Sequence, residues 1–278
     1  MSKQEMRNQE RENEAKRAVK YIRERFSFAD TPMHWAVGLV LGTGWGDVLD
    51  MKVVAEIPFR AIPGFEALGH LRGHARRLVM GRFGRKPVYV LRGRVHMNES
   101  PNDPNFAKMV RLQTEMLFQF GVRKLIVTSA VGSLRGALEV GQIAVIDGFV
   151  TVYAPEMPLW AGEFCSPEDT LSPRLRKIAR EQRGELVTRE VGHAMVRGPF
   201  FEGRKYDKAL LAQSGAGVVG MSMLPEACVA ALYDAEVLGL GFVTNDDVAE
   251  HSHEANQACA ARSAVHLGEF LARIVSRV

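Results

Sequence analysis

The sequence predicts an α/β protein, a single domain in which helices cover both faces of one central mixed sheet in three layers. Three observations support this class. Apolar runs of strand length alternate with segments in which apolar residues recur at helical spacing. The composition, 46% apolar and 24% charged over 278 residues, provides material for a large core. No linker, repeat or composition break divides the chain, so we expect a flexible segment over residues 1–14 and one domain over 15–278.

The expected elements follow from these patterns in chain order. A first helix is expected because Ala15, Val19, Ile22 and Phe26 share one narrow face. The continuously apolar run 35–41 is typical of a strand buried on both sides, and it leads into the glycine-rich segment 42–46. Further strands are expected at 51–57, 76–81, 87–92, 123–129, 142–152, 191–197, 217–221 and 236–243. Further helices are expected at 106–120, 172–183, 204–214, 224–235 and 252–277.

Charge and cysteine usage exclude several classes of protein. The net charge is only +4, and basic residues do not cluster with interleaved aromatics, which argues against nucleic acid as a partner. The three cysteines are far apart and lack CxxC spacing, so neither a disulfide framework nor a metal site is indicated. The amino terminus has no apolar stretch, and the apolar runs are too short to span a membrane. We therefore expect a cytoplasmic protein with no membrane partner.

Polar or glycine-rich segments follow six expected strands, at the end where open α/β sheets bind their ligands. Hydroxyl groups, glycine-turn amides and arginine suit a phosphate-sized anion. The candidates for that role are Thr43, Arg94, His96 and Ser222. Glu202 and Asn245 suit the edge of a heterocycle, because a carboxylate accepts hydrogen bonds and an amide both donates and accepts them.

Each of these signals also has a purely structural interpretation. GTGWG is a tight turn as readily as a phosphate loop, since it does not complete GxGxxG. Arg94 and His96 could form a surface salt-bridge face. Glu202 could be an acid at a helix amino terminus, Asn245 a turn residue, and Ser222 the cap of the next helix. The functional interpretation depends on the six segments falling at strand ends together.

The order of seven segments resembles one family. GTGWG, GHARRLVMG, GRVHMNE, TSAVGSL, GPFFE, GVVGMSMLPE and FVTN occur in this order between residues 36 and 277. The series resembles the trimeric purine nucleoside phosphorylases, a family that includes the methylthioadenosine phosphorylases. The resemblance implies a nucleoside phosphorylase fold with a partly barrel-like sheet, and a homotrimer. It also implies that inorganic phosphate attacks C1′ of a purine nucleoside of the inosine or guanosine type, giving free base and ribose 1-phosphate in purine salvage. Phosphate is then a co-substrate, and neither a metal nor an organic cofactor is needed.

The resemblance assigns a role to individual residues. Thr43, His74, Arg94 and Ser222, with the backbone N–H of Ala130, would bind phosphate, and His96 would lie beside phosphate and ribose. Met221 and Asn98 would lie at the ribose, and Phe201 would stack on the base. Glu202 would bind the N1 and N2 edge of the purine. Asn245 would bind N7 and O6, so that Asn245, His96 and Glu202 carry the chemistry. Glu99 would orient His96 or His74.

Some positions depart from the family pattern. Asn98 stands where a tyrosine is usual, and Ser129 stands where phosphorylases of 6-oxopurines carry asparagine. The TSAVGSL segment resembles the methylthioadenosine branch instead. So does a second acid, Asp247, which is a further candidate for contact with the base or ribose. A methylthioadenosine or methylthioinosine phosphorylase, and a purine-nucleoside-binding protein that has lost catalysis, therefore stay open as alternatives. In the short loop 154–168, Phe164, or failing it Trp160, is the candidate aromatic that would reach a neighbouring subunit's site.

Overall fold

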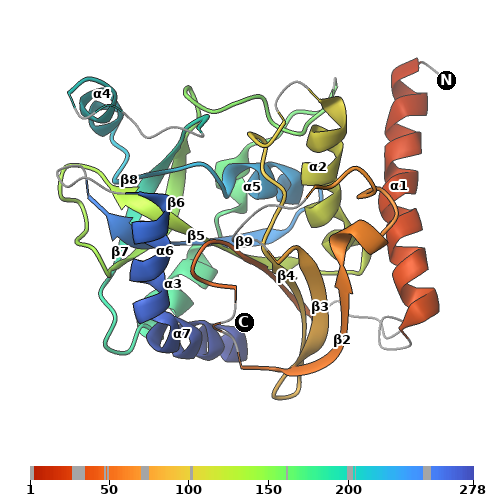
Figure 1. Cartoon of the computed structure of the whole chain (residues 1–278), viewed down its shortest axis with the longest axis horizontal. Coiled ribbons are helices and arrows are strands. Elements are labelled where there is room, and N and C mark those ends of the chain that lie inside the picture. Colours follow the sequence, from red (N-terminus) through yellow and green to blue (C-terminus); the bar gives the residue numbers. More distant parts are fainter. Residues whose placement is uncertain are drawn as a thin grey trace.

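The computed structural model describes residues 3–26, 35–46, 48, 50–69, 75–100, 103–160, 162–198, 203, 205–246 and 252–278. Strands and helices alternate along these residues, as the sequence predicts (Figure 1). In chain order the elements are α1 (Lys3–Arg25), β1 (Val37–Leu41), β2 (Lys52–Pro58), η2 (Phe59–Ala61), β3 (Arg77–Phe83), β4 (Lys86–Arg92), α2 (Pro104–Gln119), β5 (Lys124–Ser133), β6 (Ile143–Val150), η3 (Pro167–Thr170), α3 (Pro173–Glu181), β7 (Thr188–Met195), α4 (Asp207–Gln213), β8 (Val218–Gly220), α5 (Leu224–Ala231), β9 (Glu236–Asn245), α6 (His253–Arg262) and α7 (Ala264–Arg277).

The strands form one mixed sheet that is open at one end and closed into a ring at the other. The strand order is β2-β3-β4-β1-β5-β8-β7-β6-β9, and β9 also pairs with β5, so that β5, β8, β7, β6 and β9 form a closed five-stranded barrel. The predicted α/β class with a partly barrel-like sheet is confirmed. Strand β5 belongs to both parts, because it pairs in parallel with β1 and with β9. The polar segments that follow β1, β4 and β9 are thereby gathered around β5.

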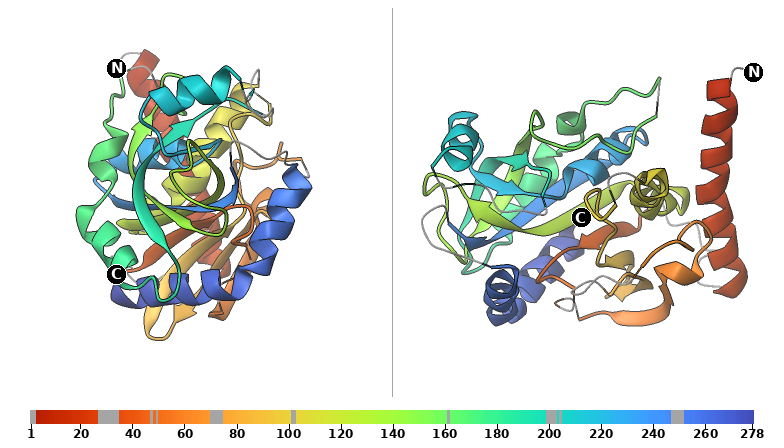
Figure 2. Two further views of the ribbon diagram at one scale, coloured as in Figure 1. Left: turned by 90° about the vertical axis from the view of Figure 1, so that its left-hand side faces the viewer. Right: turned by 45° about the horizontal axis from the view of Figure 1, so that its top comes forward.

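Helices cover both faces of the sheet, and each face has its own core. In Figures 1 and 2, α1, α2 and α5 lie on one side and α3, α6 and α7 on the other. Neighbouring residues of β1 point alternately into the two cores: Val40 packs with the α1–α2–α5 side, whereas Leu39 and Leu41 pack with the α3–α7 side. All five residues of β1 are buried, which explains the continuously apolar run in the sequence.

Local signals set the helix ends. Asp103 accepts a hydrogen bond from the amide of Asn105 at the start of α2, at 2.9 Å. Ser172 and Ser252 cap α3 and α6 in the same way. Gly121, with a φ of 99°, follows α2 in the left-handed conformation that favours glycine. None of the described helices is long and apolar enough to cross a bilayer.

The structure differs from the sequence-based expectation at two helices. Helix α1 begins at Lys3, although we expected the chain before residue 15 to lie outside the regular structure. The expected helix 252–277 is two helices, α6 and α7, which meet at Ser263, where φ is −98° and ψ is 3°. The two helices pack on opposite ends of one loop, since Ala260 of α6 contacts Gly44 and Gly268 of α7 contacts Val48. The bend at Ser263 lies between these two contacts.

Candidate active site

The carboxyl ends of three parallel strands meet at one place in the sheet. Strand β1 lies between β4 and β5, with Leu41 opposite Arg92 and Val40 opposite Val127. The segments after β1 and β4 therefore emerge beside Thr128 and Ser129, in the middle of β5. These segments contain Thr43, Arg94 and His96, the side chains that the sequence singled out for an anion.

Arg94 is the most deeply enclosed charge of this group. Its guanidinium is 2% exposed, donates to the carbonyl of Thr128, and forms an ion pair with Glu226 of α5 at 3.2 Å. A Cβ on Gly42 would lie 3.1 Å from Nη2 of Arg94, so a glycine there leaves room for the guanidinium. Burial lowers the pKa of Arg94 from its usual value, and the Glu226 carboxylate opposes that shift. The predicted alternative, a surface salt-bridge face, is wrong for Arg94.

The loop after β1 is fixed from three sides. The amide of Gly42 donates to the Thr128 hydroxyl at 3.1 Å, and the amide of Trp45 closes a turn onto the carbonyl of Gly42 at 3.0 Å. The Trp45 indole is fully buried and donates from Nε1 to the carbonyl of Ser129 at 3.2 Å. Thr43 lies half-buried at the top of this turn. These hydrogen bonds hold the backbone that carries Thr43, the candidate hydroxyl for an anion.

The segment after β4 is organised by Glu99. One carboxylate oxygen accepts the backbone N–H of His96 at 2.7 Å, and the other accepts from the guanidinium of Arg76. Arg76 also donates to the carbonyl of Gly69 at 2.7 Å. Glu99 therefore holds the backbone at His96, with Arg76 as its second partner, and its expected role in orienting a histidine side chain stays a prediction. His96 itself is half-buried.

Strand β8 and helix α5 bring Met221 and Ser222 to the same region. Ser222 is buried, and Met223, not Ser222, precedes the first turn of α5, with a φ of 77° and no side-chain cap. The alternative that Ser222 caps the helix is therefore wrong. The Met221 sulfur lies 3.7 Å from the side-chain nitrogen of Asn98. The two residues expected at the ribose are therefore in contact with each other. Gly198 faces the same sulfur, and a Cβ at that position would overlap it.

Asn245 is the last residue of β9, opposite Gly132 of β5. Its Oδ1 accepts a hydrogen bond from the Thr244 hydroxyl at 3.1 Å, which fixes the orientation of the amide. A Cβ on Gly132 would lie 2.8 Å from Nδ2, so this glycine leaves room for the amide group. Ala130 lies on the same strand as Gly132 and is half-buried. The amide of Asn245 is therefore held near the β5 segment that the resemblance places at the phosphate.

Four predicted site residues, His74, Phe201, Glu202 and Asp247, lie outside the described residues. The two candidate aromatics of loop 154–168 differ in their exposure to solvent. Phe164 is 93% exposed. Trp160 is half-buried, with the Arg111 guanidinium 5.4 Å from its ring centroid.

His193 of β7 is a buried group that the sequence analysis missed. It is completely buried, and neither ring nitrogen has a hydrogen-bond partner among the described residues. Burial, together with the positive charge of Arg94, lowers the pKa of His193 to about 4, so the imidazole is neutral. A Cβ on Gly220 would lie 2.9 Å from its Nε2. No sequence signal marks His193, because it stands within an otherwise ordinary strand.

Two further residues of the site, Glu226 and Trp45, were not singled out from the sequence although they lie in segments that were. Glu226 belongs to the GMSMLPE segment, and Trp45 belongs to GTGWG.

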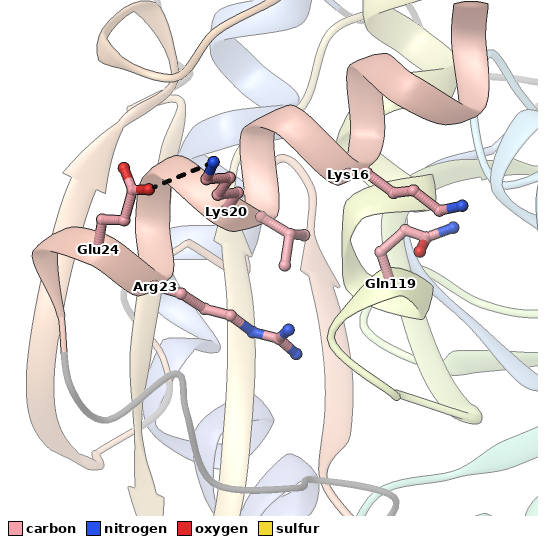
Figure 3. A pocket seen from close by; sticks show the side chains of 6 residues that line it. Lys16, Lys20, Arg23, Glu24 and Gln119 are labelled. Carbon is pink, nitrogen blue, oxygen red and sulfur yellow. Dashed lines mark ion pairs between the residues drawn. The ribbon is translucent and has the colours of Figure 1, made fainter. Parts of the chain in front are cut away.

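A cavity of about 580 Å³ lies elsewhere, between α1 and α2. It is lined by Lys16, Val19, Lys20, Arg23, Glu24 and Gln119 (Figure 3). It includes none of the predicted site residues, and two of its lining residues on α1, Lys20 and Glu24, form an ion pair at 3.8 Å. Within the part of the chain that the structure describes, no three His, Cys, Asp or Glu side chains are grouped so as to hold a metal ion.

Known proteins resemble this chain over most of its length. Residues 36–276 match the phosphorylase superfamily. Purine nucleoside phosphorylase of Mycobacterium tuberculosis is 33% identical to the chain over 95% of its length and 96% of the relative's. Purine nucleoside phosphorylase 1 of Geobacillus stearothermophilus is 29% identical and covers 82% of both chains. The chain therefore belongs to the phosphorylase superfamily and, within it, to the purine nucleoside phosphorylase family.

Solved structures agree on the fold. Isoform 2 of purine nucleoside phosphorylase from Schistosoma mansoni, in complex with cytosine and ribose-1-phosphate, superposes with a TM-score of 0.79. It is 23% identical, and the match covers 96% of each chain. A Schistosoma purine nucleoside phosphorylase in complex with hypoxanthine gives the same TM-score over 95% of this chain and 96% of the other.

Proposed function

We propose that this protein catalyses the phosphorolysis of purine nucleosides of the inosine and guanosine type. The observation that carries the proposal is the enclosed Arg94, which Thr128 and Glu226 hold where the loops after β1 and β4 meet β5. A guanidinium that is fixed in a water-poor site binds a phosphate dianion strongly, because it need not reorganise. The relatives named purine nucleoside phosphorylase support the same activity.

In the proposed reaction, phosphate lies on one face of the ribose and the purine leaves from the other. Arg94, Thr43, Ser222 and the amide of Ala130 hold phosphate, with His96 beside it and His74 as a further ligand. An oxygen of phosphate forms a bond to C1′ while the C1′–N9 bond breaks, and the bonding electrons move into the purine. The sugar has oxocarbenium character at the transition state, as in other glycosyl transfers, and the nearby dianion stabilises it.

The base-side residues would stabilise the departing purine. Asn245 donates to N7 as electron density builds up there, and the Thr244 hydroxyl keeps its amide in the donating orientation. Glu202 accepts from N1 and N2, and Phe201 stacks on the ring. Met221 and Asn98 face the ribose, and their mutual contact supports that placement. Inorganic phosphate is the only co-substrate in this proposal, and no metal or organic cofactor takes part.

We propose further that the active protein is a homotrimer located in the cytoplasm. The described cysteines are all free thiols, which supports a reducing compartment. Phe164 supports the oligomer, because a side chain of its size is 93% exposed in the single chain. In the trimer it would reach the nucleoside end of the neighbouring copy's site.

The test is release of free base from inosine, guanosine, adenosine and 5′-methylthioadenosine, each with and without phosphate. Turnover of inosine or guanosine that requires phosphate is expected. Turnover of methylthio-nucleosides alone would favour the alternative substrate class, which the segment around Ser129 suggests. In that segment the Ser129 hydroxyl donates to the carbonyl of Ala130 at 2.9 Å. Binding of nucleosides with no turnover of any would mean that the fold is kept without catalysis.

A further inference from the structure

Phe164 is exposed, but both of its neighbours in the chain are held by helices of the core. Glu163 lies on one side of it and is only 17% exposed at its side chain. Cys165 lies on the other side and packs against the buried cluster of Met195, Leu224 and Cys228. An apolar side chain that is anchored on both sides yet points into solvent differs from an ordinary loop residue, because its direction is fixed.

Arg111 of α2 provides the first anchor. Its Nη1 donates to Oε2 of Glu163 at 2.6 Å, and its Nη2 donates to Oε1 of Glu163 at 3.1 Å. The same guanidinium makes a second two-armed contact with Glu115, one helical turn further along α2, at 3.2 and 3.1 Å. Arg111 is thus a buried cation shared by two carboxylates, one on its own helix and one on the loop. Burial alone would lower its pKa, but the hydrogen bonds to Glu163 and Glu115 raise the pKa above its usual value.

The turn before Phe164 is closed around the same carboxylate. Oε2 of Glu163 accepts the backbone N–H of Trp160 at 2.8 Å, and the N–H of Glu163 donates to the carbonyl of Trp160 at 2.9 Å. The Trp160 ring then covers the Arg111 guanidinium. One carboxylate therefore fixes both the shape of the turn and its attachment to α2.

Cys228 of α5 provides the second anchor. Cys228 is buried in an apolar cluster with Met195 and Leu224, and the partly buried Cys165 packs against that cluster. Helix α5 also carries Glu226, which holds Arg94. The backbone on the carboxyl side of Phe164 is thereby attached to the helix that forms part of the phosphate end of its own site.

We propose that Arg111, acting through Glu163, is a positioning residue for nucleoside binding: it fixes the direction in which Phe164 is presented to a second copy of the chain. This inference rests on the proposed function, in which Phe164 closes the nucleoside end of the neighbouring site. Because the loop is ordered before assembly, closing that site does not cost the entropy of ordering it. Loosening the anchor weakens nucleoside binding and leaves phosphate binding alone.

The test compares two carboxylates on the same guanidinium. Glu163→Gln removes the charge on the loop side, and Glu115→Gln, the matched control, removes it on the helix side. We expect Glu163→Gln to raise the KM for inosine about fivefold, with the KM for phosphate and kcat within about twofold of the original protein. Glu115→Gln should leave the inosine KM within about twofold. An equal rise in both variants would overturn the proposal.

A double substitution tests whether Arg111 acts through Phe164. Phe164→Ala should raise the inosine KM by about tenfold or more, and adding Glu163→Gln to it should change nothing further. Effects that multiply would show that Glu163 acts by another route and would also overturn the proposal. Should Glu163→Gln fail to fold, Glu163→Asp takes its place, since it keeps the charge and withdraws the carboxylate by one methylene.

The same variants separate this inference from the proposed function. If the original protein shows no phosphate-dependent turnover, the proposed function fails. The dissociation constant for inosine, measured by calorimetry, then replaces KM in the same comparison. A Phe164-dependent effect of Glu163→Gln on that constant would still support the positioning role, and no effect would overturn it.

Discussion

Glu226 and Arg94 form an ion pair at 3.2 Å in which both side chains are 2% exposed. The two residues are far apart in the sequence, and each buried charge has the other as its counter-charge. The energetic consequence is asymmetric. A buried pair contributes little net stability relative to apolar residues, whereas removal of one partner leaves an uncompensated charge in a medium of low polarity.

Glu226→Gln should therefore lower the free energy of unfolding by about 3–5 kcal/mol, measured by urea denaturation. The KM for phosphate should change as well, because Arg94 loses the partner that fixes it. The control is Glu190→Gln, which removes a more exposed partner of Arg180 and should cost less than about 1 kcal/mol. Similar losses in both variants would mean that Glu226 is not the enclosed counter-charge of Arg94.

His193 should make stability depend on pH. Its pKa is about 4 in the folded protein and 6.5 as an ordinary histidine, so between these values the unfolded chain binds a proton that the folded chain does not. Stability is then lost as the pH falls from 6.5 towards 4, by roughly 3 kcal/mol for this one group.

The measurement is the free energy of unfolding at pH 7, 6, 5 and 4, in the original protein and in His193→Phe. The variant should lose less stability over this range, and the difference between the two curves isolates the histidine. His266→Gln, at an exposed position on α7, is the control and should follow the original curve. Parallel curves for the original protein and His193→Phe would contradict the prediction.

Asn245→Ala should lower kcat by about 10²–10³, the usual cost of removing one donor to developing negative charge. The KM for phosphate should stay within about twofold, because the proposed partner of the amide is N7 of the purine and not the phosphate. Thr244→Val removes the hydroxyl that orients this amide and should give a smaller loss of kcat, about tenfold. Steady-state kinetics with inosine checks both values. An unchanged kcat in Asn245→Ala would remove this residue from the mechanism.

Gly198→Ala should weaken nucleoside binding through Met221. Gly198 has a φ of 51°, and a Cβ there would overlap the Met221 sulfur. Gly136→Ala is a matched control, because its φ is 62° and nothing lies within 4 Å of the added carbon. Both variants carry similar backbone strain of about 1–2 kcal/mol, but only the first should raise the KM for inosine. A rise in both would assign the effect to strain alone.

Much of the fold could be predicted from the sequence, because the central strands are continuously apolar and buried and clear turn residues separate the elements. All nine strands of the described residues were expected within a few positions. The break between α6 and α7 at Ser263 was missed because no glycine or proline marks it in the sequence. Ala260 and Gly268, on either side of the break, pack against the loop after β1. Tertiary contact, not local pattern, decides that point.

The candidate site was also only partly predictable from the sequence. Thr43, Arg94 and Asn245 could be named because they follow strands whose ends the sheet must bring together. Their partners could not, since Glu226 resembles an ordinary acid in the first turn of a helix. Glu163 resembles a surface acid in the same way. An ion pair between residues distant in the chain leaves no periodic pattern, and only the folded structure shows which charges are buried together.

Because the sheet closes into a barrel on one side, β2 is its edge strand on the other side. An edge strand has unpaired backbone N–H and C=O groups that can pair with another extended chain. In β2 the register shifts between Val53 and Ala55, and Lys52 at its start is exposed. A bulge and a lysine both discourage a further strand from adding in register. The molecule can therefore keep a half-open sheet, and with it the strand ends that form the site, without an edge that invites aggregation.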